Sequence, residues 1–184
     1  MTLLNDIIKE NERRKSRLQT EYDPLRGIGS CGERTEHDCS LWGEGVVKLP
    51  TTMLHDPVFN DGMSVADYRE LRYRHDFEYW CYMRVKIHNK VTRRIEPFIL
   101  NRPQRKLLAL FERQRLARLP VRVILLKARQ WGGSTLTQIY MAWWQLVLYE
   151  NCNSVICSHF KDTSSAIRGI YNRLLENYEE ERSI

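Results

Sequence analysis

Five stretches of the chain repeat apolar residues at helical spacing. Leu107, Leu110 and Phe111 would share one face of a helix that Pro103 begins, because positions three and four apart lie on the same side of a helix. Ser64 precedes Asp67 by three residues, which is typical of a helix N-cap. The patterns predict helices over residues 2–20, from Ser64 to about Tyr82, from Pro103 onwards, after residues 127–135 through Leu148, and from Thr163 to Tyr178.

Two short apolar runs predict buried strands in the C-terminal half. The sequence reads VRVILL at 121–126 and SVICS at 154–158, and both runs are rich in β-branched residues. Each run is followed by a predicted helix, so the order is strand, loop, helix, strand, helix. That order favours a parallel sheet with helices on both faces, although two strands are too few to bury one another.

The N-terminal half has a different pattern. Residues 83–88 and 91–96 alternate around Asn-Lys and predict a hairpin. Residues 22–62 contain many glycines and prolines, and are predicted to be irregular with a Gly-rich loop. We therefore divide the chain into an N-terminal region of helices, loop and hairpin at 1–95 and the first half of an α/β domain at 96–184.

The distribution of charge suggests an anionic partner. The 184 residues carry a net charge of +6, which is mild. Residues 102–129, however, hold nine Lys or Arg against the single acid Glu112, and such a concentration favours a phosphate-facing region. The alternative is a solvated basic helix. The longest apolar stretch, 136–149, is too short to span a bilayer, so we expect no membrane association.

Residues 127–135 (KARQWGGST) have the composition of a phosphate-binding loop. Backbone N–H groups at a helix N-terminus attract phosphate, glycines allow the backbone to approach it closely, and a Ser or Thr hydroxyl binds Mg²⁺. Gly132, Gly133, Ser134 and Thr135 provide these groups. The usual lysine position holds glycine, so Lys127 or Arg129 would supply the positive charge. A simple turn between strand and helix is the alternative.

Three segments resemble the large terminase subunit of tailed phages. LLKARQWGGST is similar to its deviant Walker A loop, in which the lysine moves to the front of the loop. FILNRPQRKLLALF is similar to the upstream segment that carries an adenine-contacting glutamine, and SVICSHFKDTSSAI to the second strand and helix. The resemblance spans about residues 96–178 and implies an incomplete P-loop NTPase-type parallel sheet after a mixed, mostly helical N-terminal region.

The resemblance also implies site residues and cofactors. ATP and Mg²⁺ would be the cofactors, with Gln104 at the adenine and Ser134 as a Mg²⁺ ligand. Lys127 and Arg129 would be catalytic. The implied nucleotide-binding residues are Gln104, Lys127, Arg129, Gln130, Gly132, Gly133, Ser134 and Thr135.

The implied activity is that of a DNA-packaging ATPase in the host cytoplasm. Its partners would be double-stranded DNA, the procapsid portal and the small terminase subunit, and the full-length protein would form a homo-oligomer. No apolar run in the sequence ends in Asp-Glu, the pair that would hold Mg²⁺ and polarise water. We therefore expect an N-terminal portion that does not hydrolyse ATP by itself.

Two other functions fit the same residues. The first is another DNA translocase or helicase-like ATPase. The second is a non-catalytic nucleic-acid-binding module whose phosphate loop is vestigial. Aromatic residues beside basic ones can stack on bases, but the helical spacing of Tyr73, Phe77 and Trp80 predicts core packing instead.

Overall fold

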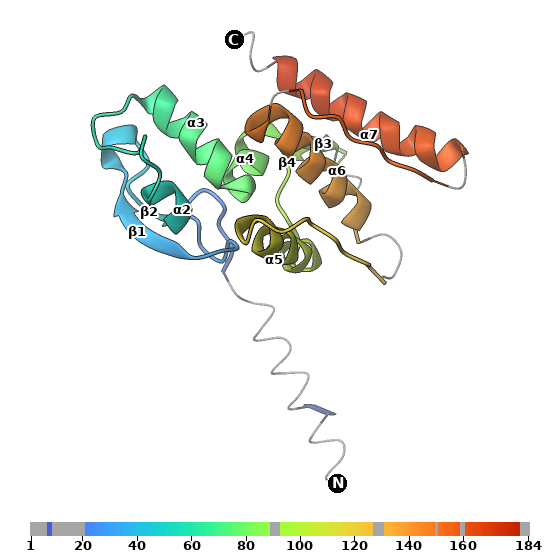
Figure 1. Ribbon diagram of the computed structural model, residues 1–184, viewed down its shortest axis with the longest axis horizontal. Helices are drawn as coiled ribbons and strands as arrows, with labels where there is room; N and C mark the ends of the chain where they lie inside the picture. The colour runs from blue at the N-terminus through green and yellow to red at the C-terminus, as the bar shows by residue number, and fades with distance from the viewer. Residues whose placement is uncertain are drawn as a thin grey trace.

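The computed structural model describes residues 7–8, 21–88, 93–126, 131–149, 151–158 and 161–180. The chain is mixed α/β, with helices predominating and two small antiparallel sheets (Figure 1). Its elements are β1 (Arg34–Asp38), the 3₁₀ turn η1 (Ser40–Trp42), β2 (Val46–Pro50), α2 (Thr51–Leu54), α3 (Val65–His75), α4 (Phe77–Arg84), β3 (Lys86–His88), β4 (Ile95–Pro97), α5 (Arg102–Leu116), α6 (Gly133–Trp143), the π-helical turn η2 (Trp144–Leu148) and α7 (Lys161–Glu180).

A hairpin of β1 and β2 replaces part of the predicted irregular region. The strands pair antiparallel from Arg34 opposite Pro50 to Asp38 opposite Val46. The sequence prediction of 22–62 was wrong here because β1 (RTEHD) lacks the apolar alternation that identifies a strand. Leu49 is fully buried on β2 and joins a small core with Trp42.

The predicted helix from Ser64 to Tyr82 is two helices, α3 and α4. Ser64 caps α3 as expected, since its hydroxyl accepts a hydrogen bond from the Asp67 N–H at 3.1 Å. The break lies at Asp76, whose φ of −125° and ψ of 86° are not helical. The Asp76 carboxylate caps α4 and also binds Arg34 through two hydrogen bonds of 2.8 and 2.9 Å. A contact distant in sequence therefore stabilises the break.

A hairpin after α4 is confirmed, but its strands are shorter than predicted and its register differs, because a two-residue turn at 89–90 would place residue 88 opposite 91. β3 and β4 pair antiparallel, with Lys86 opposite Pro97 and His88 opposite Ile95. The expected turn at Asn89-Lys90 lies outside the described residues.

The larger core joins the N-terminal region to the predicted α/β part. Helices α5, α6 and α7 lie where the sequence predicted helices. Trp143 of α6 is fully buried, and its indole N–H donates to the carbonyl of Tyr73 on α3 at 2.8 Å. Phe77 packs edge-on against Tyr140 and Trp143, which confirms its predicted place in the core.

The two strands predicted at 121–126 and 154–158 are not formed. Within the described residues, the sheets are β1–β2 and β3–β4 alone, and neither is parallel. A strand requires a hydrogen-bonded neighbour, and neither predicted segment pairs with one. Ile124 and Leu126 are consequently fully exposed.

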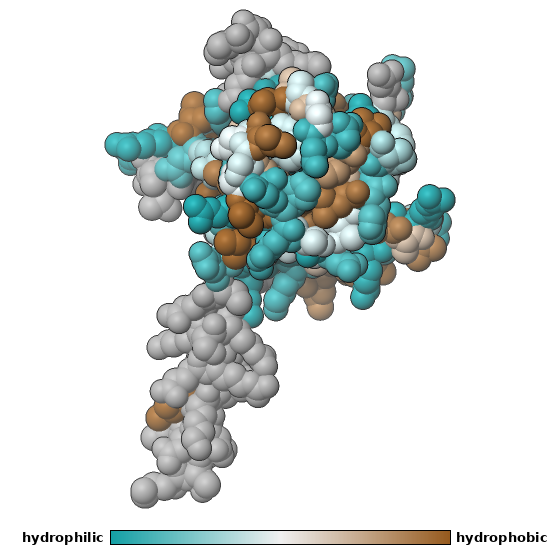
Figure 2. Space-filling model, turned by 90° about the vertical axis from the view of Figure 1, so that its left-hand side faces the viewer, coloured by the Kyte–Doolittle hydropathy of each residue, from teal (hydrophilic) through white to brown (hydrophobic). Residues whose placement is uncertain are grey.

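Some of the apolar side chains lie on the surface of the molecule. Figure 2 shows one face of the molecule, on which apolar side chains form several separate patches between polar ones. The predicted helix at 2–20 lies outside the described residues except for Ile7 and Ile8. Among the described residues, no helix has the length and apolar character needed to cross a membrane.

Candidate functional site

The candidate site is the loop that leads into α6. Gly132 has a φ of 83° and is the N-cap of the helix. This left-handed conformation suits glycine, which has no Cβ to clash with the backbone. Because glycine also has no side chain, no side-chain hydrogen bond caps α6. Within the described residues, the first N–H groups of α6 therefore have no N-cap side chain as acceptor, and a helix start of this kind favours an anion.

Two side chains at the start of α5 hold this loop. The side-chain amide N–H of Asn101 donates to the Trp131 carbonyl at 3.1 Å, and that of Gln104 donates to the Gly132 carbonyl at 3.0 Å. The structure thus brings together two predicted site residues, Gln104 and Gly132, that are 28 positions apart. Gln104 is only 4% exposed.

The capping box of α5 fixes both of these amides. The Asn101 side-chain oxygen accepts from the Gln104 N–H at 3.0 Å, and the Gln104 side-chain oxygen accepts from the Asn101 N–H at 2.9 Å. Such reciprocal bonds satisfy the free N–H groups at a helix start. Asn101 was missed as a site residue, although its position immediately before Arg102 and Pro103 is a recognisable N-cap signal.

Both loop glycines have close neighbours. A Cβ on Gly132 would lie 2.6 Å from the Gln104 amide nitrogen, and one on Gly133 would lie 2.8 Å from the Trp131 ring. Real Cβ atoms do not approach other atoms this closely, so a larger residue would force the neighbouring side chain or the loop to shift. The sequence identified these glycines. The need for glycine at each position, however, comes from a neighbouring side chain that only the tertiary structure shows.

The hydroxyl residues of the loop lie in the first turns of α6. Ser134 is exposed, so its oxygen is accessible to a metal ion or phosphate, while Thr135 is half-buried. Thr137 donates its hydroxyl to the Gly133 carbonyl at 3.0 Å and so stabilises the turn. The predicted residues Lys127, Arg129 and Gln130 lie outside the described residues.

A basic stripe follows one face of α5. Arg102, Lys106 and Arg113 are four and seven residues apart, which places them on one side of the helix. Lys106 and Arg113 are exposed. Arg115 is different because its guanidinium binds the Glu112 carboxylate at 2.6 Å.

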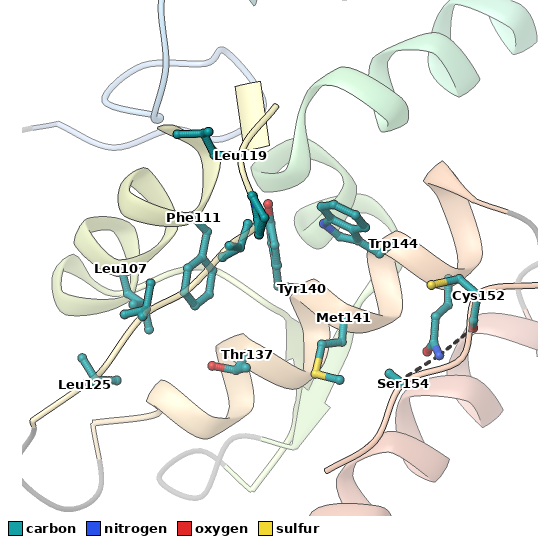
Figure 3. Close-up of a pocket in the computed structure, with 14 residues that line it drawn as sticks. Leu107, Phe111, Leu119, Leu125, Thr137, Tyr140, Met141, Trp144, Cys152 and Ser154 are labelled. Atoms are coloured by element: carbon teal, nitrogen blue, oxygen red, sulfur yellow. Dashed lines mark hydrogen bonds between the residues drawn. The ribbon is translucent and has the colours of Figure 1, made fainter. Parts of the chain in front are cut away.

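An apolar groove of about 560 Å³ lies beside α6. Figure 3 shows Leu107 and Phe111 of α5 on one side, the Tyr140 ring of α6 beside Phe111, and Thr137 and Met141 of α6 below them. The segments 119–125 and 152–154 border the groove. Gln145 fixes the second of these segments, since its amide donates to the Cys152 carbonyl and the Ser154 hydroxyl, both at 3.0 Å (Figure 3).

A buried ionic cluster lies away from the loop and has a structural role. Arg34 pairs with Asp76 at 2.8 Å and lies 3.9 Å from Glu78. Burial would raise the pKa of the Asp76 carboxyl, but Arg34 and Arg72 hold it below its usual value. Burial raises the pKa of Glu78, which accepts hydrogen bonds from the Tyr22 hydroxyl and the Cys31 N–H. These contacts join the N-terminal residues to α4.

The geometry supports binding of an anion at the start of α6. Backbone amides without an N-cap side chain, two closely packed glycines and an exposed hydroxyl belong to one loop, which the side-chain amides of Asn101 and Gln104 hold in place. Among the described residues, no three His, Cys, Asp or Glu side chains form a group that could hold a metal ion. Comparisons with protein families, curated proteins and solved structures find no significant match.

Proposed function

We propose that this chain is the ATP-binding N-terminal portion of a DNA-packaging motor of the large-terminase type. The full-length protein would translocate double-stranded DNA into a procapsid, with the portal and the small terminase subunit as partners. The observation that carries the proposal is the contact between Gln104 and Gly132. These residues belong to the two separate motifs that resemble terminase, and they meet at a helix start suited to phosphate.

Each loop residue would have a defined part in ATP binding. The N–H groups of Gly133, Ser134 and Thr135 would face the phosphates, and the Ser134 hydroxyl would be one Mg²⁺ ligand. Lys127 or Arg129 would neutralise the β- and γ-phosphates in place of the missing loop lysine. Mg²⁺ normally also takes a carboxylate ligand, and the sequence has no apolar run that ends in Asp-Glu.

The proposed fold is a parallel P-loop sheet. Residues 121–126 and 154–158 would be strands of a parallel P-loop sheet once a further strand pairs with them. The groove beside α6 is bordered by residues 119–125 and 152–154, which include parts of the two predicted strands. Its apolar lining from α5 and α6 is suited to packing against one face of such a sheet. A parallel sheet is buried on both faces in this class of protein.

The test is binding of Mg·ATP by the 184-residue chain. We expect measurable binding without turnover, and a loss of affinity of about tenfold or more for Lys127→Ala, since a site charge contributes more than ~1.4 kcal/mol. Titration calorimetry measures the affinity, and phosphate release measures turnover. Lys48→Ala, which removes an exposed lysine from β2, is the matched control.

Three outcomes would contradict the proposal in whole or in part. A chain that binds no Mg·ATP would overturn it as a whole. Unchanged affinity in both Lys127→Ala and Arg129→Ala would remove only the assignment of the loop cation. Steady hydrolysis that Ser134→Ala abolishes would instead indicate a complete small enzyme.

A nucleic-acid-binding module with a vestigial loop is the second candidate. The observation in its favour is the basic stripe of α5, in which Lys106 and Arg113 are exposed. Lysine and arginine that neutralise DNA phosphates make affinity fall steeply with salt. Salt-dependent binding of duplex DNA by a chain that does not bind Mg·ATP would favour this function over the first.

A further inference from the structure

The side chains of Asn101 and Gln104 act together on two successive carbonyls of the loop. Asn101 binds the carbonyl of Trp131, and Gln104 binds that of Gly132. We call these two side chains the amide clamp. Each uses its oxygen for the capping box of α5 and its nitrogen for the loop, so both ends of each amide are occupied.

The clamp determines where the loop N–H groups point. In a planar trans peptide, the carbonyl of one residue and the N–H of the next point in opposite directions. Because the carbonyls of Trp131 and Gly132 point toward α5, the N–H groups of Gly132 and Gly133 point away from it. A left-handed residue followed by a helical one makes successive N–H groups converge into an anion-binding concavity.

The hydrogen bonds of the Gly132 carbonyl and the burial of Gln104 also indicate that the clamp fixes the loop. The Gly132 carbonyl also accepts the first hydrogen bond of α6, from the Leu136 N–H at 3.0 Å. The same carbonyl therefore connects the clamp to the helix start. Gln104 is almost completely buried, so water does not replace the clamp bond easily.

We propose that Asn101 and Gln104 are positioning residues, which orient the loop amides toward phosphate. This role rests on the proposed function of the loop. It is separate from adenine recognition, for which the Gln104 amide keeps a second N–H. The clamp acts on the phosphate part of a ligand and is indifferent to the base.

Two substitutions remove the clamp donors and keep the helix cap. Asn101→Ser retains an N-cap oxygen without a donor that reaches Trp131, and adds no charge. Gln104→Glu retains the acceptor of the capping box but presents a carboxylate to the Gly132 carbonyl. Gln114→Glu, on the same helix, is the matched control because its side-chain oxygen still accepts from the Arg122 N–H.

The experiment combines hydrogen exchange with two kinds of ligand. We expect amide exchange in residues 131–138 to accelerate about fivefold in each clamp variant, as the loss of one typical hydrogen bond predicts. Affinities for inorganic tripolyphosphate, ATP and GTP should fall by one common factor in Asn101→Ser, which adds no charge to the loop. Melting temperatures, followed by circular dichroism, should stay close to that of the unaltered chain for Asn101→Ser and fall for Gln104→Glu, whose carboxylate is buried.

The outcomes separate the clamp from its alternatives. Unchanged exchange in both variants would overturn the clamp, whether or not any phosphate compound binds. A loss confined to ATP, with tripolyphosphate and GTP unaffected, would overturn it in favour of adenine recognition by Gln104. Failure of the unaltered chain to bind tripolyphosphate and ATP, together with faster exchange in the variants, would overturn the phosphate role and the proposed function while leaving the hydrogen bonds established.

Discussion

At the scale of single residues, Gly132 has the strictest requirements in the candidate site. Its backbone is left-handed, and the Gln104 amide occupies the space that a side chain would need. Gly43 has nearly the same φ, 84°, but open space around it. Substitutions at these two glycines can therefore separate the free-energy cost of a left-handed backbone from the cost of a steric clash.

We predict that Gly132→Ala destabilises the fold more than Gly43→Ala. A left-handed non-glycine residue costs roughly 1–3 kcal/mol, which both variants incur. Gly132→Ala should lose about 1 kcal/mol more, because the Gln104 hydrogen bond must break to admit the methyl group. Urea unfolding measures both free energies. Equal losses would mean that Gln104 moves aside freely and does not restrain the loop.

At the scale of elements, a long-range ion pair stabilises the break between α3 and α4. The break between α3 and α4 lies at Asp76, which caps α4 and binds Arg34 of β1. Arg72 is fully buried on α3 and stacks on the Tyr79 ring of α4, 3.7 Å from its centroid. These contacts connect the hairpin β1–β2 to both helices.

We predict that Arg34→Met costs roughly 3 kcal/mol, because it removes the hydrogen-bonded partner of the buried Asp76 carboxylate and leaves Arg72, 3.7 Å away, as its ion-pair partner within the described residues. Arg26→Met removes an exposed arginine 3.9 Å from Asp23 and should cost about 1 kcal/mol or less. Chemical denaturation at pH 7 compares the two. A similar small loss for both would show that Arg34 contributes no more than a surface pair.

The pH dependence of this pair follows from the lowered pKa of Asp76. A carboxyl with a lowered pKa in the folded state stabilises the fold above its unfolded pKa of about 3.9. That contribution is lost as the pH falls through the lowered folded value. The difference between the unaltered chain and Arg34→Met should therefore be largest near neutral pH and shrink in acid.

At the scale of the whole molecule, apolar side chains face solvent beside the groove at α6. Ile124 and Leu126 are fully exposed, and Val155 is 81% exposed on the opposite border segment. Unpaired segments of this kind tend to pair with other chains. The described residues thus leave a surface that a further strand or another copy would cover.

We predict that the chain self-associates through this surface. Replacing Ile124 and Leu126 by lysine should raise the monomer fraction, because charge on an unpaired edge opposes association. Sedimentation velocity over a concentration series measures the change, and Leu41→Lys is the control at an exposed apolar position of η1. The prediction would be contradicted if the unaltered chain stayed monomeric at every concentration.

The helices and the site residues differ in how far the sequence could specify them. The sequence predicted α5, α6 and α7 because caps and apolar periodicity are local features. It also identified the glycines of the loop and Gln104. It missed β1, whose residues RTEHD carry no apolar alternation, and Asn101, whose second hydrogen bond reaches a residue 30 positions away.

The sequence by itself determined the starts of α3 and α5, the glycine-rich loop and the concentration of positive charge around α5. The tertiary structure alone decided which groups hold these parts in place. It supplied Arg34 to the break at Asp76 and the Gln104 and Asn101 amides to the loop, and within the described residues it supplied no pairing strand to 121–126. The physical reason is that a cap or a turn is complete within a few residues, whereas a strand, a buried ion pair or an anchored loop requires a partner from elsewhere in the chain.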